Sequence, residues 1–160
     1  MKMHLFFLLL VIGSCVALKP LKMQRVDNLT NRIRTDGIFV SNNNRRREDC
    51  GVYIFYTNGV MLSFENRRKS NECIDYWTEH LNKNYNYKEV PYWWGIYQLT
   101  NDSISFERWL STDYYYPTIS YTGQVINDTV IIVNYESSIL DTFRFVEFSP
   151  KPDSTNIFIK

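Results

Sequence analysis

The chain has 160 residues, enough for one domain, and carries 18 Lys and Arg against 17 Asp and Glu. This balance gives no electrostatic attraction toward nucleic acid or an anionic membrane, so a nucleic-acid partner is not expected. Aromatic residues make up 16% of the chain, and they favour strands over helices.

An apolar run over residues 5–12 follows a short polar start. It is too short to span a bilayer, which needs about 20 residues, and it fits the central region of a secretory signal. The next residues, Ile12-Gly13-Ser14-Cys15, resemble the lipobox of bacterial lipoproteins, in which the cysteine becomes the lipidated N-terminus. The sequence therefore predicts a signal peptide over residues 1–14 and a lipid on Cys15. Ordinary cleavage after Ala17 is the alternative.

Hairpins follow a predicted tether over residues 15–34, which shows no clear period. The first hairpin is centred on Asn58-Gly59, the strongest short hairpin signal, because both turn positions need positive φ. A two-residue loop there fixes the register and predicts which side chains share one side of the sheet. They are Tyr53, Phe55, Leu62 and Phe64.

Two cysteines, Cys50 and Cys73, flank this hairpin. An exported protein meets an oxidising compartment, so we expect one disulfide between them, with two buried free thiols as the alternative. Ile74, Trp77 and Leu81 then recur at helical spacing, which predicts a short amphipathic helix over residues 71–84.

Two more hairpins have tips of the Asn-Asp type. A loop at Asn101-Asp102 pairs Tyr97 with Phe106 and places Arg108 on the same inner face. A loop at Asn127-Asp128 predicts two further pairs, in a register that Asn-Asp specifies less strongly than Asn-Gly does. They are Val125 with Val130 and Gly123 with Ile132.

Strands at residues 36–41 and 141–148 complete a set of about eight antiparallel neighbours. Such a meander can close into a barrel and so remove its edges. We therefore expect a mostly β domain over residues 35–149, an up-and-down eight-stranded barrel with one short helix. A half-open sheet packed on the helix is the alternative. Residues 150–160 are predicted to be a tail or a short edge strand.

The pattern over residues 35–149 resembles the small lipocalin-like lipoproteins of Gram-negative bacteria. Asp36-Gly37-Ile38-Phe39 lies where lipocalins carry Gly-x-Trp on the first strand, and Asn-Gly and Asn-Asp hairpin tips follow. Phe39 replaces the tryptophan of that motif, and the other lipocalin signatures are absent. The resemblance implies a barrel.

No motif for catalysis, metal binding or a cofactor occurs. The mature chain has one histidine, His80, and nucleophilic catalysis needs a base held against a nucleophile, so we expect no enzyme. Two Cys and one His at this spacing match no zinc pattern. The charge run at 45–49 is interpreted as a solvated loop, and the aromatic clusters at 92–95 and 113–117 as core and rim packing or a cavity lining.

The candidates for binding a small ligand are Tyr97, Arg108 and Tyr121. A buried arginine needs a partner, which can be a protein carboxylate, an exposed barrel end or a ligand carboxylate held bidentately. Gly95 and Gly123 on the inner face would leave space for a ligand. Large inner residues outnumber them and predict at most a modest cavity, namely Tyr53, Phe55, Phe64, Tyr97, Phe106 and Tyr121.

The sequence thus predicts an exported domain, tethered to the membrane of the cell envelope by its N-terminal lipid, that binds a small apolar or amphipathic ligand. The first alternative is an envelope lipoprotein with a filled core, no ligand and a protein partner, because an eight-stranded barrel can be filled by side chains. The second is a secreted lipocalin-like glycoprotein, since Asn28, Asn101 and Asn127 begin glycosylation triplets.

Overall fold

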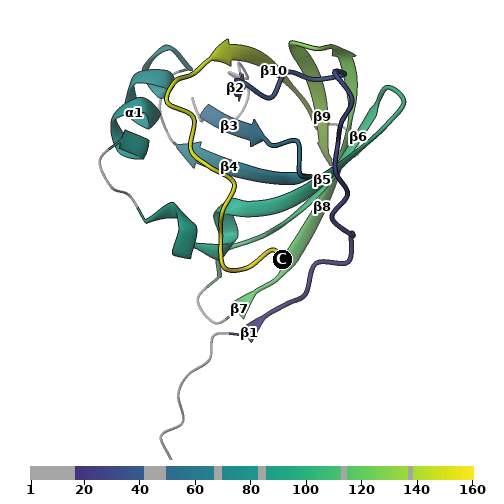
Figure 1. Ribbon diagram of the computed structural model, residues 1–160, viewed down its shortest axis with the longest axis vertical. Coiled ribbons are helices and arrows are strands. Elements are labelled where there is room, and N and C mark those ends of the chain that lie inside the picture. Colours follow the sequence, from purple (N-terminus) through teal and green to yellow (C-terminus); the bar gives the residue numbers. More distant parts are fainter. Residues whose placement is uncertain (1–16, 42–49, 67–69, 83–85, 113–114, 137–138) are drawn as a thin grey trace, which may run out of the picture.

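The computed structural model describes residues 17–41, 50–66, 70–82, 86–112, 115–136 and 139–160. Eight strands close into an antiparallel barrel in the order β10-β2-β3-β4-β5-β6-β8-β9, and α1 lies against its outside (Figure 1). This confirms the predicted eight-stranded barrel with one short helix, and the half-open sheet is wrong. The barrel strands are β2 (Gly37–Ser41), β3 (Cys50–Phe55), β4 (Val60–Asn66), β5 (Trp94–Thr100), β6 (Ser103–Trp109), β8 (Thr118–Asn127), β9 (Val130–Glu136) and β10 (Ile139–Glu147).

Short elements lie outside the barrel. β1 (Ala17–Leu18) pairs in parallel with β7 (Tyr115–Tyr116), and two 3₁₀ turns, η1 (Tyr87–Glu89) and η2 (Pro91–Trp93), lead into β5. The helix α1 (Ser70–Asn82) covers the predicted range closely. Residues 156–160 form no strand, so the C-terminal segment is a tail.

The barrel has two apolar layers, one inside and one outside. The inner layer is built by alternate residues of every strand, among them Phe39, Tyr53 and Phe106. The outer layer covers β2, β3, β4 and β5, where α1, the N-terminal segment and the C-terminal tail pack on the sheet (Figure 1). Phe64 on β4 stacks on Trp77 of α1, with ring centroids 4.4 Å apart. Both faces of these strands are therefore buried, whereas many antiparallel sheets have one face exposed to solvent.

The register of the first hairpin differs from the prediction. Tyr56 pairs with Val60 across a three-residue loop, in which Gly59 takes a φ of 77°. Phe55 therefore lies opposite Met61, and Tyr53 lies opposite Ser63. The predicted inner positions of Leu62 and Phe64 are wrong, because one extra loop residue moves every side chain of β4 to the other face.

The second hairpin has the predicted register, with Tyr97 opposite Phe106. The third does not, because β8 contains a bulge between Val125 and Asn127. Val125 consequently pairs with Ile131, and the inward residues of β9 are one position later than predicted. They are Ile131, Val133 and Tyr135.

A disulfide joins Cys50 at the start of β3 to Cys73 in α1, with a Cα–Cα distance of 6.2 Å. Both cysteines are buried in the outer layer. The predicted pairing is confirmed, and it fixes α1 to the barrel wall. The hairpin alone does not bring the two together, because Cys50 lies opposite Asn66 and the chain reaches Cys73 only through the first turn of α1.

The segment over 17–34, predicted to be a tether, lies along the barrel (Figure 1). Asn28 is 8% exposed, and its backbone N–H donates to Thr57 O at 2.7 Å. The Asn28 side-chain amide donates to Val26 O and Tyr97 O, so the asparagine of the first glycosylation triplet is engaged in packing.

Candidate functional site

One end of the barrel is closed by the segment over residues 28–34. It crosses the tips of the β3–β4, β5–β6 and β8–β9 hairpins, where Arg34 N–H donates to Asp128 O at 2.9 Å. Ile33 inserts into the inner layer and is only 3% exposed. A ligand of the inner face would therefore have to approach from the opposite end, where β2 finishes and β3 begins.

The inside of the barrel is filled by aromatic rings. Tyr53 contacts Phe143 and Phe106, with ring centroids 4.6 Å and 5.1 Å apart, and Phe55 contacts Tyr97 at 4.8 Å. Edge-on and tilted contacts at these distances are the favourable ones for aromatic pairs. These side chains fill the middle of the barrel, as they can in a small eight-stranded barrel.

The two inner-face glycines do not open a cavity. A Cβ on Gly95 would come within 2.5 Å of Glu107 O and 2.9 Å of the Arg108 Cβ. A Cβ on Gly123 would lie 2.3 Å from Ile132 O. Both glycines therefore serve close packing against the neighbouring strand. At Gly95 the missing side chain accommodates Arg108, which lies directly opposite on β6.

Arg108 is the central charged group of the barrel end that residues 28–34 do not cover, here named the open end. The residue is 8% exposed, and its Nη2 donates to Glu65 Oε1 on β4. Its Nε–H is buried and has no hydrogen-bond partner among the residues that the structure describes. Burial disfavours the charged guanidinium and is the largest single influence on it. The Glu65 carboxylate and the hydroxyl groups of Tyr53, Tyr121 and Tyr135 together outweigh burial, so the pKa of Arg108 lies above its ordinary value. Arg108 is thus a positively charged side chain of which Nη2 is hydrogen-bonded to Glu65 and Nε is not hydrogen-bonded within the described residues.

Tyrosines surround this cation on the inner face. The hydroxyl groups of Tyr53 and Tyr135 are 2.7 Å apart, and the Tyr121 ring lies 4.8 Å from that of Tyr135. Burial raises the pKa of the Tyr53 and Tyr135 hydroxyls, so both stay protonated across the physiological range.

A half-buried carboxyl group, that of Asp141, lies on the same inner face. Ser41 Oγ donates to Asp141 Oδ2 at 2.6 Å, while the other oxygen, Oδ1, is buried and has no partner within the described ranges. Burial raises the pKa of the Asp141 carboxyl, and its bonds to Ser41 and Thr142 oppose this shift. The open end therefore offers both a cation and a carboxyl group among hydroxyl groups.

Two of the three predicted ligand residues come together and one does not. Arg108 and Tyr121 lie on the neighbouring strands β6 and β8, on the same face and at the open end. Tyr97 lies toward the closed end, where its hydroxyl donates to Tyr56 O at 2.8 Å. Glu65 and Tyr135 complete the cluster. Neither was predicted as an inner residue, because Glu65 follows the three-residue loop and Tyr135 follows the bulge.

No protein-family model, no curated protein and no solved structure matches this chain.

Two further features concern the part of the chain that the structure describes. Within those residues no group of three or more His, Cys, Asp or Glu side chains could hold a metal ion. No helix in the same ranges is long and apolar enough to cross a membrane. The lipobox-like residues ending at Cys15 and the charge run at 45–49 lie outside the described residues.

Proposed function

We propose that the protein is an exported, membrane-tethered barrel domain that binds a small ligand with an anionic group at the open end of the barrel. The fold is compatible with this role, because eight-stranded barrels of this size can hold one small ligand. The proposal has two separable parts, the tether and the ligand.

The tether rests on the sequence and on the disulfide. The apolar run at 5–12 and the lipobox-like Ile12-Gly13-Ser14-Cys15 support export with lipid attachment. The Cys50–Cys73 disulfide is compatible with an oxidising compartment outside the cytoplasm. A multiply acylated N-terminus would hold the domain durably on a membrane surface.

Replacing Cys15 with Ser tests the tether. The wild-type protein should sediment with membranes, and the Cys15→Ser variant should appear in the soluble fraction of the exported material. Equal membrane fractions for the two proteins would contradict lipid anchoring at this cysteine. A mass measurement of the N-terminal peptide provides an independent reading of acylation.

The ligand part rests on the unpartnered Nε–H of Arg108. A guanidinium binds a carboxylate most strongly through two parallel N–H bonds, and Glu65 occupies only Nη2. The Glu65 side chain is 64% exposed, so it can leave for solvent at low cost. A ligand carboxylate or phosphate would then take both Nε and Nη2.

The filled interior limits the size of this ligand. Because the aromatic rings of Tyr53, Phe106 and Phe143 occupy the centre, the ligand would bind near the rim and not deep in the barrel. Its apolar part would lie against the rings of Tyr121 and Tyr135. A small, partly aromatic or short-chain anion fits these conditions.

The decisive measurement compares the native mass with the denatured mass of the protein purified from the compartment to which it is exported. An excess mass that is lost on denaturation supports a bound ligand. The Arg108→Met variant should lose that excess, while Arg144→Met, an exposed arginine on β10, should keep it. Retention of the excess by Arg108→Met would contradict the proposed role of Arg108.

The filled core also favours a second candidate, a lipoprotein that acts through its surface on a protein partner. Equal native and denatured masses, together with unchanged folding of the Arg108→Met variant, would favour this candidate. The two candidates share the tether and differ only in the role of the open end.

A further inference from the structure

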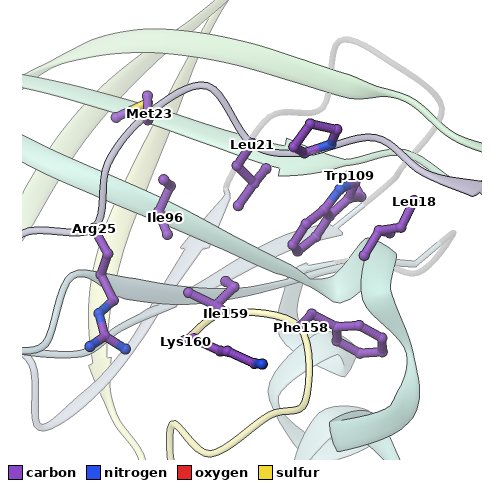
Figure 2. A pocket seen from close by; sticks show the side chains of 10 residues that line it. Leu18, Leu21, Met23, Arg25, Ile96, Trp109, Phe158, Ile159 and Lys160 are labelled. Carbon is purple, nitrogen blue, oxygen red and sulfur yellow. The ribbon is translucent and has the colours of Figure 1, made fainter.

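A groove on the outside of the barrel lies apart from the open end. It runs between the N-terminal segment and the C-terminal tail and has a volume of about 270 Å³ (Figure 2). Its floor is formed by the outward side chains of Ile96 on β5 and Trp109 on β6, each 2% exposed. The remaining walls are Leu18, Pro20, Leu21, Met23, Arg25, Phe158, Ile159 and Lys160.

The N-terminal wall is held by specific hydrogen bonds. The buried Glu107 carboxylate accepts from the backbone N–H groups of Lys22 and Met23 at 2.7 and 2.8 Å. Trp109 Nε1–H donates to Lys19 O at 2.6 Å. These bonds position the segment across β6, so this side of the groove is formed before any ligand arrives.

The opposite wall is fixed as well. Asn156 Oδ1 accepts from the backbone N–H groups of Phe158 and Ile159 at 2.9 and 2.7 Å, which turns the tail back toward the barrel. The Phe158 ring lies 6.2 Å from that of Trp109. A groove with two fixed walls loses little conformational entropy on binding.

The lining combines apolar side chains with positive charge. Arg25 and Lys160 are exposed cations at the rim, and none of the described residues that line the groove is acidic. The Glu107 carboxylate lies beneath the N-terminal wall, where it accepts the two backbone bonds. Figure 2 shows Arg25 on the side of the pocket away from Leu18 and Trp109, whereas Lys160 lies beside Ile159 with its nitrogen toward Phe158, so one of the two cations is separated from the aromatic part. Such a layout is complementary to a molecule with one apolar end and one anionic end.

We propose that this groove binds a single-chain amphipathic anion of the fatty-acid type, with its chain on Trp109 and its carboxylate between Arg25 and Lys160. The volume is just under the range of about 300–1,000 Å³ that is usual for drug-sized ligands, which suits one alkyl chain. This site is distinct from the open end and does not depend on Arg108.

Fluorescence quenching by a brominated fatty acid, used as a monomer below its micelle concentration, tests the proposal. The full chain with Cys15→Ser is used, so that no acyl chain of its own can compete. Saturable quenching is expected, and Trp109→Phe should abolish the saturable component. Trp93→Phe, which removes a tryptophan from outside the groove, should leave it intact. Quenching that survives in Trp109→Phe would overturn the assignment.

Matched variants test the two ends of the ligand separately. The Arg25→Gln/Lys160→Gln double variant should weaken binding of the fatty acid about five-fold, since exposed ion pairs contribute modestly. A brominated alcohol with the same chain should bind the unmodified groove about five-fold more weakly than the acid. Equal affinity of acid and alcohol would overturn the role of the two cations.

The apolar wall is tested in the C-terminal tail. Ile159→Asp should reduce binding strongly, while Ile157→Asp, at a residue that is 69% exposed and outside the groove, should not. Equal loss in both variants would contradict the site. Quenching by vesicles of brominated phosphatidylglycerol, with no response to the monomeric fatty acid, would also overturn it in favour of a membrane-docking face.

Discussion

The Cys50–Cys73 disulfide should supply a large share of the stability of this domain. It joins β3 to α1 across a sequence separation of 23 residues, and both cysteines are buried. Without it α1 would be held mainly by packing such as the contact between Phe64 and Trp77. Removing the bond therefore raises the conformational entropy of the unfolded chain, because residues 50–73 no longer form a closed loop. It also removes the covalent link between α1 and the barrel in the folded state.

The expected loss follows from loop closure. In the chain-entropy description, a closed loop of this length stabilises the folded state by about 3.5 kcal/mol at 25 °C. With a urea dependence of about 2 kcal/mol per molar, the midpoint of unfolding should fall by roughly 1.7 M. Replacing both cysteines with alanine avoids burying new polar groups, so the Cys50→Ala/Cys73→Ala variant isolates this contribution.

Urea unfolding, followed by tryptophan fluorescence and far-ultraviolet circular dichroism with and without a reductant, is the assay. The wild-type midpoint should fall on reduction to near that of the alanine variant, and the reductant should not move the alanine variant. If wild-type midpoints with and without reductant coincide while a thiol assay shows that Cys50 and Cys73 are reduced, the loop-closure reasoning is refuted.

Three further outcomes test the packing and the titration of the barrel. Ile33→Ala should cost about 2–4 kcal/mol in urea unfolding by emptying the closed end, whereas Ile126→Ala, at a residue that is 54% exposed, should cost under about 0.5 kcal/mol. Gly95→Val should lower the melting temperature, because its Cβ would lie 2.5 Å from Glu107 O, and an unchanged melting temperature would contradict that contact. Burial lowers the pKa of Lys151 to about 8, below the 10.5 of an unperturbed lysine, so the native state loses this proton first and stability should rise between about pH 8 and 10.5. Urea midpoints across that range should show the rise in the wild type and less of it in Lys151→Met.

The barrel was predictable from the sequence because turn residues and aromatic strands recur at regular intervals. The second hairpin was also predicted in detail. Its two-residue loop is accommodated by Asn101 at a φ of 53°, and asparagine tolerates this left-handed geometry better than most residues. The inward position of Arg108 followed directly from that register.

The other two registers could not be derived from the pattern of apolar residues. In a sheet with one wet face, a slip of one residue would place apolar side chains in water and so be detectable. Here α1, the N-terminal segment and the tail cover the outer face of β3 and β4, so Ile54 and Leu62 outside are as buried as Phe55 and Met61 inside. Both alternatives for the first hairpin bury apolar side chains, and local sequence cannot choose between them.

The same ambiguity explains which residues of the candidate site could be predicted from the sequence. Arg108 and Tyr121 lie on β6 and the start of β8, before the bulge, and their faces were predicted. Glu65 and Tyr135 lie on β4 and β9, beyond the three-residue loop and the bulge, where the predicted registers turn the wrong side chains inward. Glu65, the partner of Arg108, was therefore not predicted, because the first turn is one residue longer than expected. The need for a partner was evident, since a buried arginine carries a charge that must be compensated.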